Sequence, residues 1–377
     1  MAVANRVREL AAAGRDVVGL QTGDPDFVTP QHIVEAAHRA LLAGDTHYPP
    51  ARGTKPLLEA IAGKLERENG VSVKPTQIIA TPGGKWAIYL ALAALLESGD
   101  EVILPEPAWV SYRPMIASFG GVTAGVTLDP AENFTLTEAA LRAAVTPRTK
   151  AILVNSPSNP TGHVFRRDEV EAIVAVATSA DLYVISDEIY ERITFDEHEH
   201  YSLAADPRIA DRTLLVNGFS KAYAMTGWRL GYLAAPPPII ELALRLQSQA
   251  VTSASTVAMA AGVAALNGSQ DCVLEMVAAY DDRRRYFVRA LNAMGLACPD
   301  VEGAFYVFPR VPEWPGGSDA FARELLDEAG VAVVPGGAFG PPGEGHVRGT
   351  LATSMTDLER AAERMERFVR ERVGARV

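Results

Sequence analysis

The chain has 377 residues, of which 48% are hydrophobic and 21% charged, a composition typical of a folded globular protein rather than a disordered one. Its 46 acidic residues outnumber its 35 basic ones, and the net charge of −11 argues against general binding to nucleic acid or to anionic membrane surfaces. No apolar run approaches the length of a membrane span, and the N-terminus lacks the apolar core of a signal peptide. Because Cys272 and Cys298 have no metal-ligand spacing, we expect two buried thiols, no metal site and a cytoplasmic location.

At this length, two domains are the default expectation. Residues 1–30 contain no run suited to a large sheet, and we expect them to pack on the smaller domain. Between about residues 77 and 235, short runs rich in β-branched residues alternate with helical patterns, which predicts an α/β domain with a mostly parallel sheet and helices on both faces. The predicted buried strands are 77–81, 101–105, 122–128, 150–155, 183–188, 213–219 and 231–236. The last of these follows a short connection and is expected to be antiparallel.

After residue 236 the pattern changes to that of a smaller α+β domain. A long helical region is followed by three strand-like runs and two further helices; the strands are expected at 303–308, 331–336 and 346–352, and the helices at 318–330 and 356–373. We expect the charged run Asp281–Arg285 to be a solvated helix face. The predicted division is an N-terminal segment at 1–30, a large domain at 31–280 and a small domain at 281–377.

Polar residues follow the strands at their carboxyl ends, where ligands bind in open α/β sheets. Two glycines, Gly83 and Gly84, open a helix after the first run, and free N–H groups at a helix N-terminus attract phosphate. The other strand ends deliver an amide, a carboxylate with a phenol, a lysine and an arginine, namely Asn159, Asp187 with Tyr190, Lys221 after Ser220, and Arg229. Each residue alone is typical of a solvated loop, but their joint placement indicates one site.

This set of side chains suits pyridoxal 5′-phosphate (PLP). That cofactor needs a lysine amine to bond to its aldehyde, a carboxylate to keep its pyridine nitrogen protonated, and a cradle for its phosphate. Lys221 provides the amine, and a partly desolvated lysine is more readily a free amine than a surface lysine. Asp187 provides the carboxylate, whose charge raises the basicity of a neighbouring ring nitrogen. Arg229 provides the cationic grip on the phosphate.

Eight pieces of the chain form one pattern: TGDPDF (22–27), Tyr48, GGK (83–85), WVSY (109–112), NSPSNPTG (155–162), SDEIY (186–190), SKAYAMTGWRLGY (220–232) and HVR (346–348). With these motifs the chain resembles the class I and II aminotransferases of PLP fold type I, in their bacterial aspartate aminotransferase-like branch, over essentially its whole length. The resemblance implies a large domain with a mostly parallel seven-stranded sheet and a smaller α+β domain.

The resemblance also implies how the cofactor is held. Asp187 pairs with the ring nitrogen, Asn159 and Tyr190 hydrogen-bond the ring oxygen, and Trp109 stacks on the ring. Lys221 forms the covalent link. The full set implied to bind the cofactor is Tyr48, Gly83, Gly84, Lys85, Trp109, Asn159, Asp187, Tyr190, Ser220, Lys221 and Arg229. Of these, Lys221, Asp187 and Tyr190 are implied to be catalytic.

Further matches concern the substrate and the quaternary structure. Arg348 matches the arginine that clamps the substrate α-carboxylate, a bidentate task for which lysine is a poor substitute. Gly23 matches a backbone contact to the same carboxylate, and Lys85 matches a lysine that faces a distal carboxylate. Tyr48 matches a tyrosine that reaches the phosphate of the neighbouring subunit, so the resemblance implies a homodimer with shared sites. Trp109 and Asn159 complete the implied substrate-binding set.

The resulting hypothesis is an amino-acid aminotransferase that works by a ping-pong Schiff-base mechanism, with aspartate or glutamate as donor and a 2-oxo acid as acceptor. Trp86 and Gln21 could instead shape a site for aromatic side chains, which keeps an aromatic or prephenate-type aminotransferase open. Elimination, cyclisation or decarboxylation on the same fold is a second alternative, because the ring-binding residues are shared. A regulatory protein that binds the cofactor without turnover is disfavoured by the acidic charge and by the absence of a segment for DNA binding.

Overall fold

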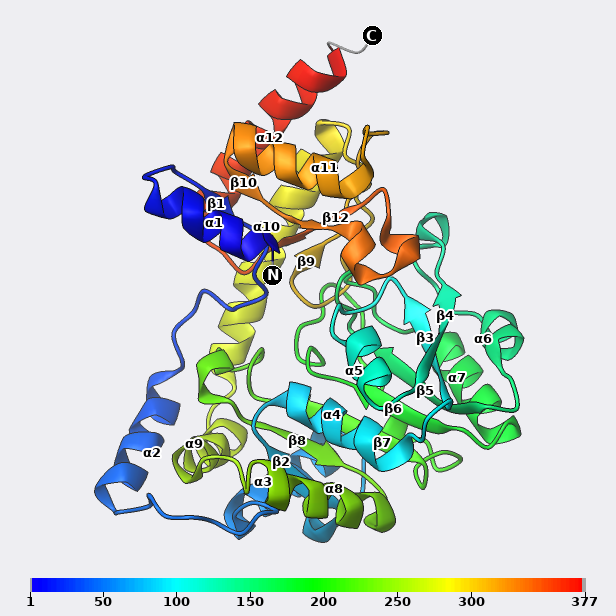
Figure 1. Ribbon diagram of the computed structural model, residues 1–377. Coiled ribbons are helices and arrows are strands. Elements are labelled where there is room, and N and C mark those ends of the chain that lie inside the picture. Colours follow the sequence, from blue (N-terminus) through cyan, green and yellow to red (C-terminus); the bar gives the residue numbers. More distant parts are fainter. Residues whose placement is uncertain (1, 375–377) are drawn as a thin grey trace.

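A computed structural model describes residues 2–374 and shows two packed parts, with the N-terminal helix beside the C-terminal elements (Figure 1). The larger part is built on a seven-stranded sheet in the order β2-β8-β7-β6-β5-β3-β4. Strands β3 to β7 pair in parallel, whereas β8 is antiparallel to both β2 and β7. The strands are β2 (Ile78–Thr81), β3 (Glu101–Glu106), β4 (Val122–Thr127), β5 (Thr149–Asn155), β6 (Tyr183–Asp187), β7 (Thr213–Gly218) and β8 (Gly231–Ala234). The predicted fold class and the antiparallel last strand are therefore confirmed.

The prediction that all seven strands are buried is wrong for β4. This strand has a neighbour on one side only, and its first residue, Val122, is 51% exposed. An edge strand keeps the β-branched composition of a strand without being covered on both faces. Composition alone therefore could not distinguish it from the central strands.

Helices cover both faces of the sheet, and the alternation of side chains along the strands explains why. In β3, Ile103 packs into one apolar core and Leu104 into another on the opposite face, as a period of two requires. The first core lies under α6 (Glu138–Ala144) and α7 (Arg167–Ser179), and the second under α4 (Gly84–Leu95), α5 (Tyr112–Ser118) and α8 (Pro237–Ala250). A third core joins the β2–β8 end to α2 (Gln31–Leu42), α3 (Lys55–Asn69) and α9 (Thr256–Asn267).

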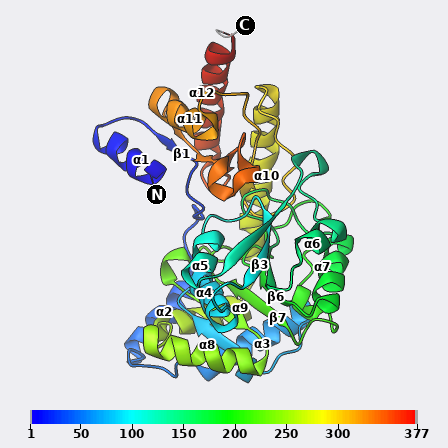
Figure 2. The same cartoon turned by 45° about the vertical axis from the view of Figure 1, so that its right-hand side comes forward.

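The smaller part contains a three-stranded antiparallel sheet, in the order β11-β12-β9, with its own apolar core. Strand β1 pairs in parallel with β10, and Leu10 of α1 packs against Leu326 and Ala332, so these N-terminal elements lie on the small domain. Figure 2 shows the same neighbourhood from another side. The elements are α1 (Ala2–Ala12), β1 (Val18–Gly19), α10 (Asp271–Ala293), β9 (Tyr306–Val307), α11 (Gly317–Glu324), β10 (Val331–Ala332), β11 (Val334–Pro335), β12 (Val347–Thr350) and α12 (Met355–Gly374).

Helix α10 connects the two parts. Its residue Val273 belongs to the core of α2, α3 and α9, whereas Phe287 belongs to the core of the small domain. The helix is continuous through residue 280, so the division into 31–280 and 281–377 remains our proposal for assigning its two halves. None of the helices in the described part of the chain is long and apolar enough to cross a membrane.

The charged run on α10 is not the solvated face that we expected. Arg283 donates to both carboxylate oxygens of Asp26 at 2.8 Å, and Arg284 donates to Asp196, Asp281 and the carbonyl of Val301. Both arginines are buried because the N-terminal segment and the loop after β6 cover this face of the helix. Of the two cysteines, Cys298 is buried as predicted and Cys272 is only partly covered.

Candidate active site

The lysine that follows β7 is half-buried where the N-terminal segment meets the large sheet. Lys221 Nζ donates a hydrogen bond to the carbonyl of Gly23 at 2.6 Å. Burial, together with the nearby charges of Arg348 and Arg229, lowers the pKa of Lys221 to about 8, although Asp24 and Asp187 act in the opposite direction. A substantial share of free amine is therefore accessible near neutral pH.

Asp187 lies at the carboxyl end of β6, close enough to Lys221 for the charge of the lysine to act on its carboxylate. It is buried, and its carboxylate accepts hydrogen bonds from Tyr112 Oη at 2.7 Å and from the backbone N–H of Ile189 at 3.2 Å. Burial raises the pKa of Asp187 to about 6, against the lowering effect of these two donors, and the charge of Glu188 adds to the rise. A cationic partner would hold this carboxylate ionised.

The arginine of β12 shows an unfilled hydrogen-bonding capacity. Arg348 donates through Nη2 to the carbonyl of Gln21 at 2.7 Å and through Nη1 to Asn159 Oδ1 at 3.1 Å. Its Nε is buried and has no hydrogen-bond partner among the described residues. The guanidinium lies 4.5 Å from the ring centroid of Tyr306 and 5.1 Å from that of Phe339, and burial lowers its pKa. A buried donor without an acceptor is costly, so this side chain is suited to an incoming carboxylate.

Tyr190 and Asn159, which the resemblance assigns to the cofactor ring, lie near this arginine. Tyr190 Oη lies 2.8 Å from Tyr306 Oη, and the backbone N–H of Asn159 donates to the side chain of Asn155 at 2.8 Å. Asn155 in turn donates to the carbonyl of Asp187 at 2.9 Å. The turn that carries Asn159 is thereby fixed to the strand end that carries Asp187.

The glycines after β2 face Arg229 closely. Gly83 has φ +87°, and a Cβ built on it would lie 2.6 Å from Arg229 Nη2. Arg229 itself is left-handed, with φ +55°, and its guanidinium donates to the carbonyl of Thr226 at 2.8 Å. Gly84 begins α4, so its N–H is one of the free donors at a helix N-terminus. Ser220 is buried directly before Lys221.

Lys85, on the first turn of α4, reaches over the side chain of Trp109. Its Nζ lies 4.7 Å from the centroid of that ring, and burial and the charge of Arg229 lower its pKa. Trp109 also packs edge-on against Tyr112, with ring centroids 5.3 Å apart. The Trp109 ring is thus held between Lys85 and Tyr112.

One residue of the predicted set lies apart from the others. Tyr48, in the loop between α2 and α3, is 89% exposed. Large apolar side chains near it in the sequence, Val28 and Leu42, are exposed to 88% and 76%. A single chain therefore brings all predicted residues except Tyr48 toward the carboxyl edge of the sheet.

Two contributors were not identified from the sequence. Tyr112 hydrogen-bonds Asp187, and its place within WVSY was the available signal. Tyr306 contacts Tyr190 and Arg348 from β9, in a run that looked like an ordinary strand. Its hydroxyl also fills the space where a Cβ at residue 23 would lie, which explains the glycine there.

Comparisons with known proteins agree with this geometry. Residues 15–365 match the family described as aminotransferase class I and II. The chain is 44% identical to an aspartate aminotransferase of Pyrococcus abyssi, covering 97% of this chain and 94% of that protein. It is 43% identical to an aspartate/prephenate aminotransferase of Cereibacter sphaeroides, covering 98% and 95%. A solved aromatic aminotransferase of Pyrococcus horikoshii superposes with a TM-score of 0.93 at 44% identity, covering 97% and 99% of the two chains.

Proposed function

Because the chain belongs to the class I and II aminotransferases, and so transfers amino groups between amino acids and 2-oxo acids, we propose that it is a PLP enzyme with aspartate or glutamate as its amino donor. The observation that carries the cofactor assignment is that a half-buried lysine, Lys221, lies near the buried Asp187 and Arg348 at one edge of the sheet. The dicarboxylic donor is supported by Lys85 and by the name of the Pyrococcus abyssi relative.

The residues of the site fit the cofactor. The missing Cβ of Gly83 lets the Arg229 guanidinium lie against the start of α4, where helix N–H groups are free, and this pairing suits a phosphate. Asp187 accepts from Tyr112 and Ile189 and makes no ion pair with any described residue, which suits a protonated ring nitrogen. Bound PLP would supply an electron sink for the electrons left at the substrate Cα.

Lys221 would move the proton. Its Nζ, with a pKa of about 8, can accept the proton of the substrate Cα as a free amine and can later return a proton as the ammonium. Desolvation makes this possible, since a surface lysine would be almost entirely protonated at the same pH. The carbonyl of Gly23, 2.6 Å from Nζ, holds the side chain in place when it is not covalently engaged.

Arg348 would bind the substrate α-carboxylate. Its unpaired Nε supplies one donor, and the carboxylate can compete for the donors now directed to Gln21 and Asn159. A bidentate pair with a planar guanidinium fixes orientation as well as energy. The stacked Tyr306 and Phe339 rings exclude water from this pair.

We also propose a homodimer in which Tyr48 completes the phosphate site of the partner subunit. The support is the exposure of Tyr48, together with the exposed apolar side chains Val28, Leu41 and Leu42. Exposed large apolar side chains are common at protein–protein interfaces.

The donor's side chain would be recognised by Lys85. A distal carboxylate bound to its Nζ gains a charge-assisted hydrogen bond of roughly 1.5–3 kcal/mol, which corresponds to a ten- to hundredfold preference over an uncharged analogue. An aromatic donor is the second candidate, because the Cereibacter sphaeroides and Pyrococcus horikoshii relatives are named for prephenate and aromatic substrates. For such a donor, Lys85 would remain over the Trp109 ring, where it lies in this structure.

One comparison separates these candidates: kcat/KM for aspartate, glutamate, phenylalanine and alanine in the wild type and in Lys85→Ala. We expect the variant to lose ten- to hundredfold on aspartate and glutamate and to change little on phenylalanine and alanine. Lys74→Ala, which removes an exposed lysine, is the matched control. An equal loss on all four donors, or no loss, would remove the argument for a dicarboxylic donor.

A further inference from the structure

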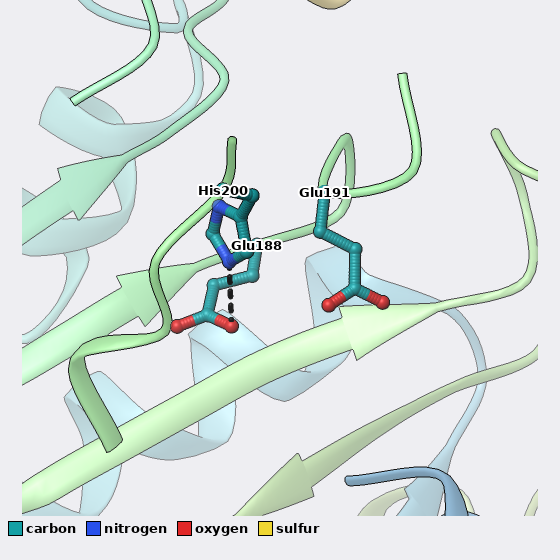
Figure 3. Close-up of side chains that lie close together, drawn as sticks. All are labelled: Glu188, Glu191 and His200. Atoms are coloured by element: carbon teal, nitrogen blue, oxygen red, sulfur yellow. Dashed lines mark hydrogen bonds and ion pairs between the residues drawn. The ribbon is translucent and has the colours of Figure 1, made fainter. Parts of the chain in front are cut away.

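The segment that carries Asp187 and Tyr190 has a second, opposite face that the proposed reaction does not use. Glu188 lies close to Glu191 and His200, as Figure 3 shows, and the three side chains are largely buried. Their ligand atoms lie within 4.8 Å of one another. Two carboxylates in so small a buried volume require positive charge.

Glu188 is held by three donors. The hydroxyls of Ser186 and Ser202 both donate to Oε1 at 2.9 Å, and His200 Nε2 lies 3.1 Å from Oε2. The backbone N–H of Glu188 donates to the carbonyl of Val216 at 2.9 Å, which fixes the residue to β7. This carboxylate is almost fully buried and directly adjoins Asp187 in the chain.

Glu191 already has its cation. The ammonium of Lys64, from α3, hydrogen-bonds Glu191 Oε1 and Asn69, and Asn69 Nδ2 donates to Glu191 Oε2 at 2.6 Å. Lys64 is itself buried, so its charge is stabilised by these side chains and not by water. Because Lys64 already forms an ion pair with Glu191, we interpret the cluster as an ion network and not as three free ligands for a metal.

The charge balance then turns on His200. Glu68, 4.0 Å from Lys64 and 2.7 Å from Arg192, borders the cluster, but its charge and that of Arg192 cancel. With the histidine neutral, Glu188, Glu191 and Lys64 therefore leave one unbalanced negative charge; with the histidine protonated, the sum is zero. Burial disfavours the charged ring, but Glu188 and Glu191 outweigh both it and the repulsion of Lys64, and the pKa of His200 is raised above its usual value. Nδ1 has no hydrogen-bond partner among the described residues in either form, so it does not favour one of them.

We propose that His200, as an imidazolium, balances the charge of Glu188 and thereby keeps the neighbouring Asp187 carboxylate ionised. His200 is thus a positioning residue that acts through Glu188, while Tyr112, Ile189 N–H and Lys221 act on Asp187 from the other side. The link is physical: an unbalanced negative charge at Glu188 disfavours a second one at Asp187. The proposal rests on the proposed role of Asp187 as the partner of the cofactor's ring nitrogen.

The test compares wild type with His200→Gln, which keeps a donor to Glu188 but has no charge, and with His200→Ala, which has neither. His198→Gln is the matched control, because His198 is in the same loop but lies near Glu302 instead. The first readout needs no cofactor: NMR of ¹³C-labelled histidine in the apoprotein, with the His200 signal assigned by its loss in the variants. The second is the dissociation constant of PLP between pH 5 and 9.

We expect the His200 signal to titrate above its usual value of about 6.5, so that the ring is protonated at lower pH. We expect both His200 variants to move the acid limb of PLP binding to higher pH by about one unit, with the His198 control unchanged. A His200 titration midpoint below 6.5, or a Gln variant that binds PLP like wild type, would overturn the proposal. If wild type bound no PLP while His200 titrated as expected, the proposed cofactor would fail and the charge balance would stand.

Discussion

The phosphate cradle can be tested by adding a single methyl group. Gly83→Ala places a Cβ 2.6 Å from Arg229 Nη2 and 3.0 Å from its Cζ, and the guanidinium must move because these contacts are closer than carbon and nitrogen atoms tolerate. The backbone of residue 83, with φ +87° and ψ 161°, lies in a region almost confined to glycine and adds a cost of about 1–3 kcal/mol for a residue with a side chain. Losing the contact between Arg229 and a phosphate removes about 1.5–3 kcal/mol, so PLP should bind roughly ten- to hundredfold more weakly.

The control isolates the contact from the backbone cost. Gly99 has φ +94°, and nothing lies within 4 Å of a Cβ built there, so Gly99→Ala carries the φ cost alone. Both variants should unfold at a lower temperature than wild type, but only Gly83→Ala should lose PLP affinity, measured by equilibrium dialysis of the apoprotein. If a folded Gly83→Ala bound PLP as tightly as wild type, the space beside Arg229 would not be the phosphate site.

Three further outcomes are expected. Borohydride should fix PLP on Lys221, as mapped by peptide mass spectrometry, and Lys221→Ala should retain PLP binding but lose transamination by several orders of magnitude; an adduct on another lysine would refute the assignment. If Tyr48 acts across the dimer, an equal mixture of Tyr48→Ala and Lys221→Ala subunits should regain about a quarter of all its sites, because half of the dimers are hybrids and one of the two sites in each hybrid is intact. No recovery would place Tyr48 elsewhere. His163 contacts Glu169 and Glu302, which raise its pKa to about 9 in spite of burial. The protonated histidine should therefore stabilise the fold by roughly 3 kcal/mol below pH 6.5, and this contribution should be lost as the pH rises through 9. The unfolding temperatures of wild type and His163→Gln should converge at alkaline pH, and a difference that stays constant with pH would contradict this.

The large sheet could be predicted because its strands, all but β4 largely buried, are runs rich in β-branched residues separated by helical patterns. The site followed from the same reasoning, since parallel strands bring their carboxyl ends to one edge. Asp187, Lys221 and the glycines after β2 were found in this way. These residues are determined by local sequence and by sheet topology together.

Contacts between distant segments could not be predicted. Arg283 looked like a surface residue because nothing local announces Asp26, which lies 257 positions away in the sequence. Tyr306 approaches Tyr190 only because the short strand β9 packs against the loop after β6. Residues of ordinary type in ordinary local contexts thus became part of the site through tertiary packing, which neither propensity nor periodicity encodes.

The chemistry of the site depends on that packing as well. Desolvation is the largest influence on both central groups: it lowers the pKa of Lys221 to about 8 and raises the pKa of Asp187 to about 6. The shift brings the amine of Lys221 closer to neutrality, where it can accept and return a proton, whereas the shift of Asp187 means that this carboxylate needs a cationic partner to stay ionised. The segment around Gly23 supplies part of this burial, and Arg348 reaches Lys221 from β12 of the small domain. Separation of these elements from the large sheet would return the pKa of Lys221 toward its ordinary value, so the contact between the two parts of the chain is itself a condition for the proposed proton transfer.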